Sequence, residues 1–171
     1  LLGVACCDIT PPVGIYHRMW GAATHDRAVG VHRPLQASAC VFQSKASAEA
    51  ASASGAAARS EIEQVLVVVD HCLLFAREME ELLGRIAAGS EIPRDRLLVV
   101  FSHTHSAGLM SHDREHLPGG ELISPYLELL GTRLAEIVRE VRKQFPKAKL
   151  GIHAHNDMGY GVANSMSAVF E

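Results

Sequence analysis

The chain has 171 residues, a formal net charge of −3 and a pI near 6.4, which give no electrostatic basis for binding nucleic acid. Hydrophobic residues make up 48% of the sequence and charged residues 20%, as in a globular domain with its own apolar core. No apolar run approaches the roughly 20 residues of a membrane-spanning helix, so we expect no transmembrane segment.

The N-terminal third is predicted to hold loops and short strands. Neither proline of Asp8–Gly14 can donate to a strand ladder, so this segment is extended or turned. Leu35–Gln43 is predicted to form a strand. Residues 44–60 are almost entirely Ala and Ser and have no amphipathic face, which favours a mobile surface insertion over a helix.

The middle of the chain alternates strands and helices. Val65–Val69 and Leu97–Phe101 are continuous apolar runs, typical of buried strands, and the first is expected to be covered on both faces. Helical spacing of apolar residues predicts covering helices over Phe75–Ile86 and from Ser124 to Phe145, and Leu150–Ala154 is a third candidate strand. The fold class is therefore α/β: a layered mixed sheet with parallel pairing and covering helices.

We expect the chain to be a fragment of a larger catalytic domain. It starts without Met or a signal-peptide pattern, and Ser165–Glu171 contains no capping signal. Cys6 and Cys7 are adjacent and are not expected to bridge each other. Cys40 and Cys72 lie in apolar runs and are expected to be buried free thiols.

Two histidines one residue apart follow the strand predicted at Leu97–Phe101. Residues i and i+2 of an extended segment share a face, so His103 and His105 are expected to project together from the strand's carboxyl end. Open α/β sheets place ligand sites at that edge. Two adjacent imidazoles suit a divalent metal, or one ligand plus one hydrogen-bond donor. Two loop histidines bonded to backbone carbonyls are the alternative.

Four segments, in this order, resemble the opening of the neutral/alkaline (non-lysosomal) ceramidase family. They are Gly3–Gly14 with its Asp-Ile-Thr-Pro, Gly30–Ala37 with its Gly-Val-His-Arg-Pro-Leu, Val67–Asp70, and Ser102–Gly108 with its His-Thr-His-Ser. This resemblance implies that residues 1–171 are a single, incomplete N-terminal part of a ceramidase-like catalytic domain.

The resemblance implies Zn²⁺ as cofactor and zinc-dependent hydrolysis of an N-acyl amide bond in a ceramide-like lipid. His103 matches the family's zinc-binding histidine. His105 matches a histidine beside the metal that assists substrate binding and oxyanion stabilisation. Asp70 matches an aspartate for which two roles are open: a partner that orients a histidine, or a turn carboxylate. His32 is expected to shape a turn rather than to bind metal.

The family's other metal ligands, another His, a Glu and a Tyr, and its serine have no match in this chain, so the chain alone is expected to be inactive. Ser38 and Ala107 replace the family's usual Arg and Gly, which affects the expected substrate more than the fold. The resemblance favours sphingolipid metabolism and an extracytoplasmic, secreted or surface-facing location. It leaves the oligomeric state open. Residues 112–116 are expected to form a solvated loop, with an entrance to the metal site as the alternative.

Residues 150–171 resemble a second family. His153 and His155, followed by Asn156, resemble the His-x-His-Asn-Asp segment of homocitrate and isopropylmalate synthases, TIM-barrel enzymes that bind a divalent cation there. This resemblance implies an alternative function, a metal-dependent acyl-CoA condensing enzyme with His153 and His155 as ligands. A chance likeness and a tail from another gene are both open. A non-catalytic domain that keeps the fold is the remaining hypothesis.

Overall fold

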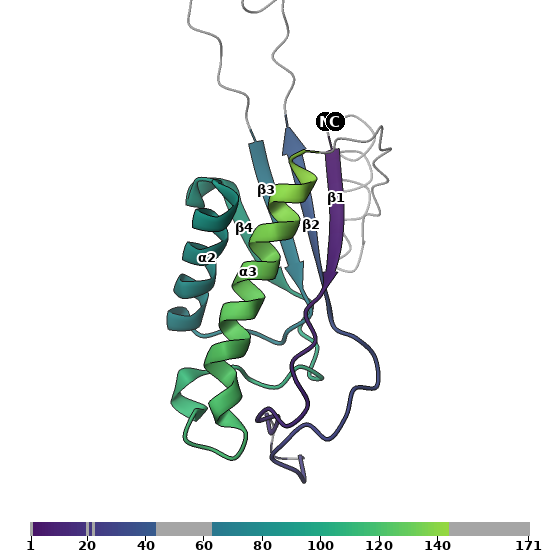
Figure 1. Ribbon diagram of the computed structural model, residues 1–171, viewed down its shortest axis with the longest axis vertical. Coiled ribbons are helices and arrows are strands. Elements are labelled where there is room, and N and C mark those ends of the chain that lie inside the picture. The colour runs from purple at the N-terminus through teal and green to yellow at the C-terminus, as the bar shows by residue number, and fades with distance from the viewer. Residues whose placement is uncertain (1, 20, 22, 44–62, 144–171) are drawn as a thin grey trace, which may run out of the picture.

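The computed structural model describes residues 2–19, 21, 23–43 and 63–143, which form a four-stranded mixed sheet covered by helices (Figure 1). The strands are β1 (Leu2–Asp8), β2 (Gln36–Gln43), β3 (Glu63–Val69) and β4 (Leu97–Phe101), and the helices are α2 (Ala76–Ser90) and α3 (Ile123–Val141). Short 3₁₀ turns lie at η1 (Arg94–Arg96), η2 (His112–Arg114) and η3 (Gly120–Leu122). The predicted α/β fold class is confirmed.

The strands follow one another across the sheet in the order β1-β2-β3-β4. Strand β2 pairs antiparallel with both β1 and β3, whereas β3 and β4 run parallel. Parallel neighbours need a crossover connection, and α2 supplies it between β3 and β4. The parallel pair brings the carboxyl ends of β3 and β4 to the same edge of the sheet.

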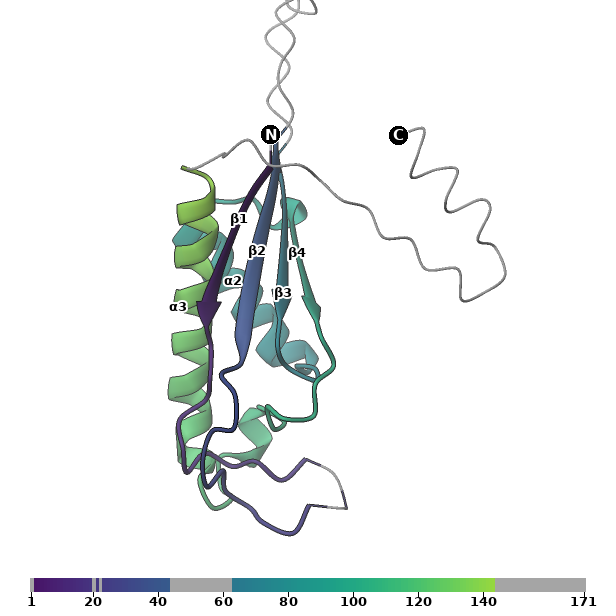
Figure 2. The ribbon, with the colours of Figure 1, turned by 90° about the vertical axis from the view of Figure 1, so that its right-hand side faces the viewer.

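One face of the sheet packs against both helices and forms the core, with α3 on one side of the strands in Figure 2. Ala39, Val67 and Val99 lie in register across β2, β3 and β4 and are buried. Helix α3 packs over β1 and β2 with an apolar stripe in which Leu130 and Leu134 are fully buried. This burial of apolar surface holds the layers together.

The opposite face of the sheet is only partly covered by the described residues. Leu98 on β4 has 60% of its surface exposed and Val4 on β1 has 54%. Leu66 and Val68 on β3 are half-buried. The prediction that β3 is buried on both faces is therefore wrong for this part of the chain, because α2 and α3 cover the same face.

The Asp-Ile-Thr-Pro segment ties the end of β1 to the start of β2. The Oδ1 atom of Asp8 accepts hydrogen bonds from the backbone N–H and the hydroxyl of Thr10, at 2.8 and 2.6 Å. The Thr10 hydroxyl oxygen in turn accepts the Leu35 N–H at 2.9 Å. Arg133 of α3 donates to the Asp8 carbonyl. The segment thus anchors a long loop beside the carboxyl edge of the sheet.

Helix α3 begins at Ile123 and ends at Val141, close to the predicted range, but the Ser124 side chain does not cap it. No helix in the described ranges has the length and apolar character needed to cross a membrane. The insertion predicted at 44–60, the strand predicted at 150–154 and the end of the predicted helix at Phe145 lie outside the described residues.

Candidate metal centre

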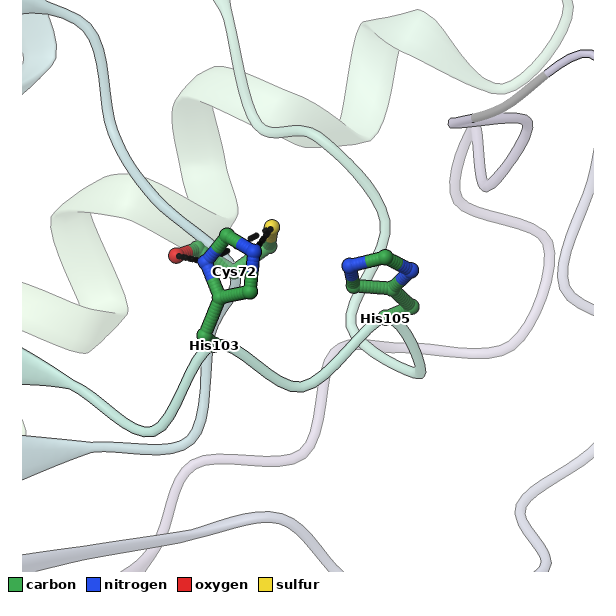
Figure 3. Close-up of side chains that lie close together, drawn as sticks. All are labelled: Cys72, His103 and His105. Atoms are coloured by element: carbon green, nitrogen blue, oxygen red, sulfur yellow. Dashed lines mark hydrogen bonds between the residues drawn. The ribbon is translucent and has the colours of Figure 1, made fainter. Parts of the chain in front are cut away.

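Three potential metal ligands meet where β3 and β4 end. Cys72 lies in the turn after β3, and His103 and His105 follow β4. One ligand atom from each, a cysteine Sγ and two imidazole nitrogens, can be chosen so that all three lie within 4.8 Å of one another (Figure 3). The Ser102 N–H donates to the Val69 carbonyl at 3.0 Å, which extends the pairing of the two strands up to this cluster.

The two histidines come together through a bend, not through an extended strand. His103 has φ 60°, a left-handed conformation, and a turn follows at His105. The expectation that both side chains lie on one face of an extended segment is therefore wrong, because the segment is not extended at His103. The rings nevertheless meet, edge to face, with centroids 5.3 Å apart and an interplanar angle of 67°.

One nitrogen of His103 is oriented by the backbone. Its Nδ1 lies 3.2 Å from the carbonyl oxygen of Cys72, a group that can only accept, so Nδ1 carries the hydrogen in this bond. The lone pair of Nε2 is then available to a cation, an arrangement common among metal-binding histidines. Cys72 is buried, whereas His103 and His105 are exposed, so one side of the cluster is open to solvent. Imidazole and thiolate donors fit zinc chemistry.

Asp70, the predicted strand-end carboxylate, is bonded to β2. Its Oδ2 accepts the Gln36 N–H at 3.0 Å, and its own N–H donates to the Gln36 carbonyl at 3.0 Å. This two-point contact fixes the start of the turn that carries Cys72. A role for Asp70 in orienting a histidine stays a prediction.

His71 fixes the middle of the same turn from inside the protein. Its side chain is fully buried, and Nε2 lies 2.6 Å from the hydroxyl oxygen of Tyr126 in α3. Burial lowers the pKa of His71 from 6.5 to about 4. The negative charge of the nearby Asp70 acts in the opposite direction and offsets this only in part. The imidazole is thus neutral at physiological pH and acts as a structural anchor.

The long N-terminal loop reaches the other side of the cluster. The Nε2 atom of His17 lies 2.9 Å from the Ser106 carbonyl oxygen, one residue beyond His105. Gly108 has φ 72°, and a side chain there would press on the backbone of His17 and Tyr16. His32 lies exposed in a bend of this loop and is not among the three clustered ligands, as expected.

A second polar cluster surrounds His112 and lines a cavity of about 300 Å³ between η2, α2 and α3. The Nδ1 atom of His112 lies 2.6 Å from Oε1 of Glu115, and its Nε2 atom lies 2.9 Å from Oε2 of Glu81 in α2. These two bonds raise the pKa of His112, with Glu115 as the larger cause. The His112 side chain is only 12% exposed, so the expectation of a solvated loop is wrong at this residue.

Cys72 is the member of the candidate metal cluster that the sequence did not predict, because a cysteine in an apolar run is more typical of an ordinary buried thiol. The available signal was its position three residues after β3 ends at Val69, since the neighbouring parallel strand β4 ends at Phe101, two residues before His103. His153 and His155, the alternative ligands, lie outside the described residues.

No family model matches the sequence, and neither does any curated protein. Among solved structures, neutral ceramidase from Pseudomonas aeruginosa aligns with a TM-score of 0.52 and 14% identity, over 83% of this chain and 20% of that chain. A structure described as a ceramidase complexed with C2 aligns with a TM-score of 0.49 and 15% identity, over 82% of this chain and 20% of that one. The chain thus spans about a fifth of the length of these proteins. It has the fold of a segment of neutral ceramidase.

Proposed function

We propose that this chain is part of a zinc-dependent amidohydrolase that cleaves the N-acyl bond of a ceramide-like lipid. The observation that carries the proposal is the meeting of His103 and His105 at the carboxyl edge of the parallel strands, in a fold shared with neutral ceramidase. The order of the sequence segments that resemble that family supports the same conclusion.

The residues of the cluster have distinct tasks in this reaction. Zinc, when bound, supplies a Lewis acid that polarises the amide carbonyl and acidifies a water molecule. His103 would hold the ion through Nε2, because its Nδ1 is engaged with the Cys72 carbonyl. His105, whose ring lies beside that of His103, donates a hydrogen bond to the oxyanion that forms as the amide is attacked.

The remaining parts of the catalytic site are proposed to lie in a longer natural protein. This chain covers a fifth of the matched ceramidase chain, so residues 1–171 are proposed to be an incomplete part of one catalytic domain. An extracytoplasmic location is proposed on the same family resemblance. Reading the source gene past Glu171 tests the first point: a frame that supplies a further His, a Ser, a Glu and a Tyr supports it, and a frame that continues as barrel strands contradicts it.

Zinc content distinguishes this proposal from the acyl-CoA condensing alternative. The protein encoded by the longest natural reading frame is equilibrated with zinc, dialysed, and measured by elemental mass spectrometry, with about one ion per molecule expected. His103→Ala should abolish retention of the ion, whereas the matched change His153→Ala should leave it unchanged. The reverse pattern would assign the metal to the tail. Fatty acid release from an N-acylsphingosine, measured with the longest natural reading frame, then tests the amidase activity.

A further inference from the structure

His17 holds the turn that carries His105. The Nε2 atom of His17 lies 2.9 Å from the Ser106 carbonyl oxygen, and a carbonyl can only accept, so Nε2 carries the hydrogen and donates it. The Ser106 N–H donates to the hydroxyl oxygen of Thr104 at 3.3 Å. Both backbone polar groups of Ser106 are thus engaged, and its carbonyl is bonded to an imidazole 89 residues away in the sequence.

The N-terminal loop holds His17 in place for this bond. The His17 N–H donates to the Asp26 carbonyl at 2.6 Å, and Tyr16 pairs with Arg27 in an antiparallel bridge. The imidazoles of His17 and His25 stack, with ring centroids 5.4 Å apart and an interplanar angle of 14°. The returning half of the loop therefore supports both the backbone and the ring of His17.

The two loops also meet through their backbones. Gly108 has φ 72°, and a Cβ atom there would lie 3.3 Å from the Cα atom of His17 and 3.3 Å from the Tyr16 carbonyl oxygen. Ala107, between this glycine and Ser106, is fully buried. This close packing sets the distance that the His17 side chain spans to reach the Ser106 carbonyl.

We propose that His17 is a positioning residue for His105 and fixes the direction in which the His105 ring presents its hydrogen-bond donor. The inference rests on the proposed function, in which His105 donates to the oxyanion. Such a donor stabilises the transition state only if it is aligned before the charge develops, and a misplacement of about 1 Å can cost about 100-fold in rate. Because His17 acts through the Ser106 peptide and not through His103, its loss should lower kcat and leave zinc binding intact.

Three substitutions of His17 test which atom matters, in the protein encoded by the longest natural reading frame, by fatty acid release from an N-acylsphingosine. His17→Phe keeps a planar ring without the donor and is expected to lower kcat by about 10- to 100-fold, with KM and zinc content near those of the wild type. His17→Gln, whose amide nitrogen has the reach of Nε2, should recover most of this loss. His17→Asn, whose amide nitrogen has only the reach of Nδ1, should not. His32→Phe, at an exposed position of the same loop, should have the wild-type kcat.

A double variant separates positioning from a purely structural role. His105→Ala alone is expected to lower kcat by about 100- to 1000-fold, and adding His17→Phe should lower it no further, because the two residues act as one unit. A loss from His17→Phe that is as large without the His105 imidazole as with it would contradict the inference. Full activity of the single variant His17→Phe would also contradict it.

The ring of His105 gives a second readout that needs no turnover. In protein labelled with ¹³C at histidine Cε1, the His105 signal is assigned by its loss in His105→Ala. It should broaden or split in His17→Phe and match the wild type in His17→Gln.

The two readouts together separate the inference from the proposed function. If the His105 signal responds but the protein releases no fatty acid, the positioning role stands and the proposed function fails. If the protein is active and the His105 signal is unchanged in His17→Phe, the inference fails and the proposed function stands. Neither survives if both responses are missing.

Discussion

The Nε2 atom of His71 lies 2.6 Å from the hydroxyl oxygen of Tyr126, and that hydroxyl donates to the Ile9 carbonyl at 2.7 Å. Because the hydroxyl proton is used on Ile9, His71 donates through Nε2. Tyr126→Phe leaves a buried N–H and a buried C=O without their partner. We expect the free energy of unfolding to fall by about 2 to 4 kcal/mol, measured by urea denaturation of the full chain.

Tyr16→Phe is the matched control for this loss. Tyr16 is also buried, but its hydroxyl makes no hydrogen bond within the described residues, and its ring faces the guanidinium of Arg114 at 5.7 Å. Removing its hydroxyl is expected to change the free energy of unfolding by no more than about 0.5 kcal/mol. Equal effects of the two changes would show that the Tyr126 bridge does not stabilise the fold.

The cluster around His112 should make stability depend on pH. The hydrogen bonds that His112 donates to Glu115, the larger cause, and to Glu81 raise the pKa of His112 above 6.5 in the folded state. A raised pKa means that the folded state binds the proton more tightly. The stabilisation is therefore fully present below pH 6.5 and is lost as pH rises through the folded pKa. His112→Gln should flatten the dependence of the free energy of unfolding on pH above pH 6.5.

The carboxylates of the same cluster act at lower pH. The bond to His112 is the main cause that lowers the pKa of Glu81, and the bond from Ser124, followed by that to His112, lowers the pKa of Glu115. Their contribution is present above pH 4.5 and is lost as pH falls through the folded pKa values.

His116→Gln, at an exposed loop histidine, is the control for His112→Gln and should leave the dependence of the free energy of unfolding on pH as in the wild type. An unchanged profile in His112→Gln would contradict the assignment.

The loop before α3 depends on a glycine. Gly119 has φ 85°, and a Cβ atom there would overlap the Gly14 carbonyl oxygen and lie 2.9 Å from the Tyr16 nitrogen. Gly119→Ala is expected to lower the free energy of unfolding by more than about 2 kcal/mol, because it combines backbone strain with a steric clash.

Gly84, inside α2, offers the opposite case. A Cβ atom there meets nothing within 4 Å, so Gly84→Ala should raise stability by about 0.5 to 1 kcal/mol through helix propensity. Thermal and urea unfolding of both variants check the pair. Stability changes of the same sign would contradict the described backbone of one of the two glycines.

Arg142 joins three elements at the far end of the core. Its Nε donates to Glu63 at the start of β3 at 2.8 Å, and a terminal nitrogen donates to the Ser90 carbonyl at the end of α2 at 2.6 Å. Arg142→Gln should lower the free energy of unfolding by about 2 kcal/mol, because it leaves a largely buried carboxylate unpaired. Arg139→Gln, at an exposed position of α3, should change it little. Similar losses in urea denaturation would contradict this role for Arg142.

Much of the fold follows from local sequence patterns. The strand predicted at Leu97–Phe101 has these same bounds in the structure, and the strands and helices predicted from apolar spacing lie within a few residues of the observed ones. The covering of the sheet was not predictable in the same way. A valine-rich run such as Val65–Val69 has one pattern whether its second face meets a helix of this chain or is left exposed.

The candidate site was predictable only in part. His103 and His105 were recognisable because they are close in sequence and follow a strand. Cys72 lies 31 residues before His103, and their contact exists only because β3 and β4 pair in parallel. The left-handed bend at His103 was also hidden, since local sequence predicts an extended strand exit there.

That bend has a consequence for protein engineering. His103 and Glu91 are the non-glycine residues of the described chain with positive φ, and Glu91 is at the end of α2, where this conformation is common. At His103 it costs about 1 kcal/mol, which a glycine would recover. A screen that selects for thermal stability should therefore enrich His103→Gly over His103→Ala and in doing so remove the proposed metal ligand. At this position, the residue that gives the highest stability differs from the residue that is proposed to bind the metal.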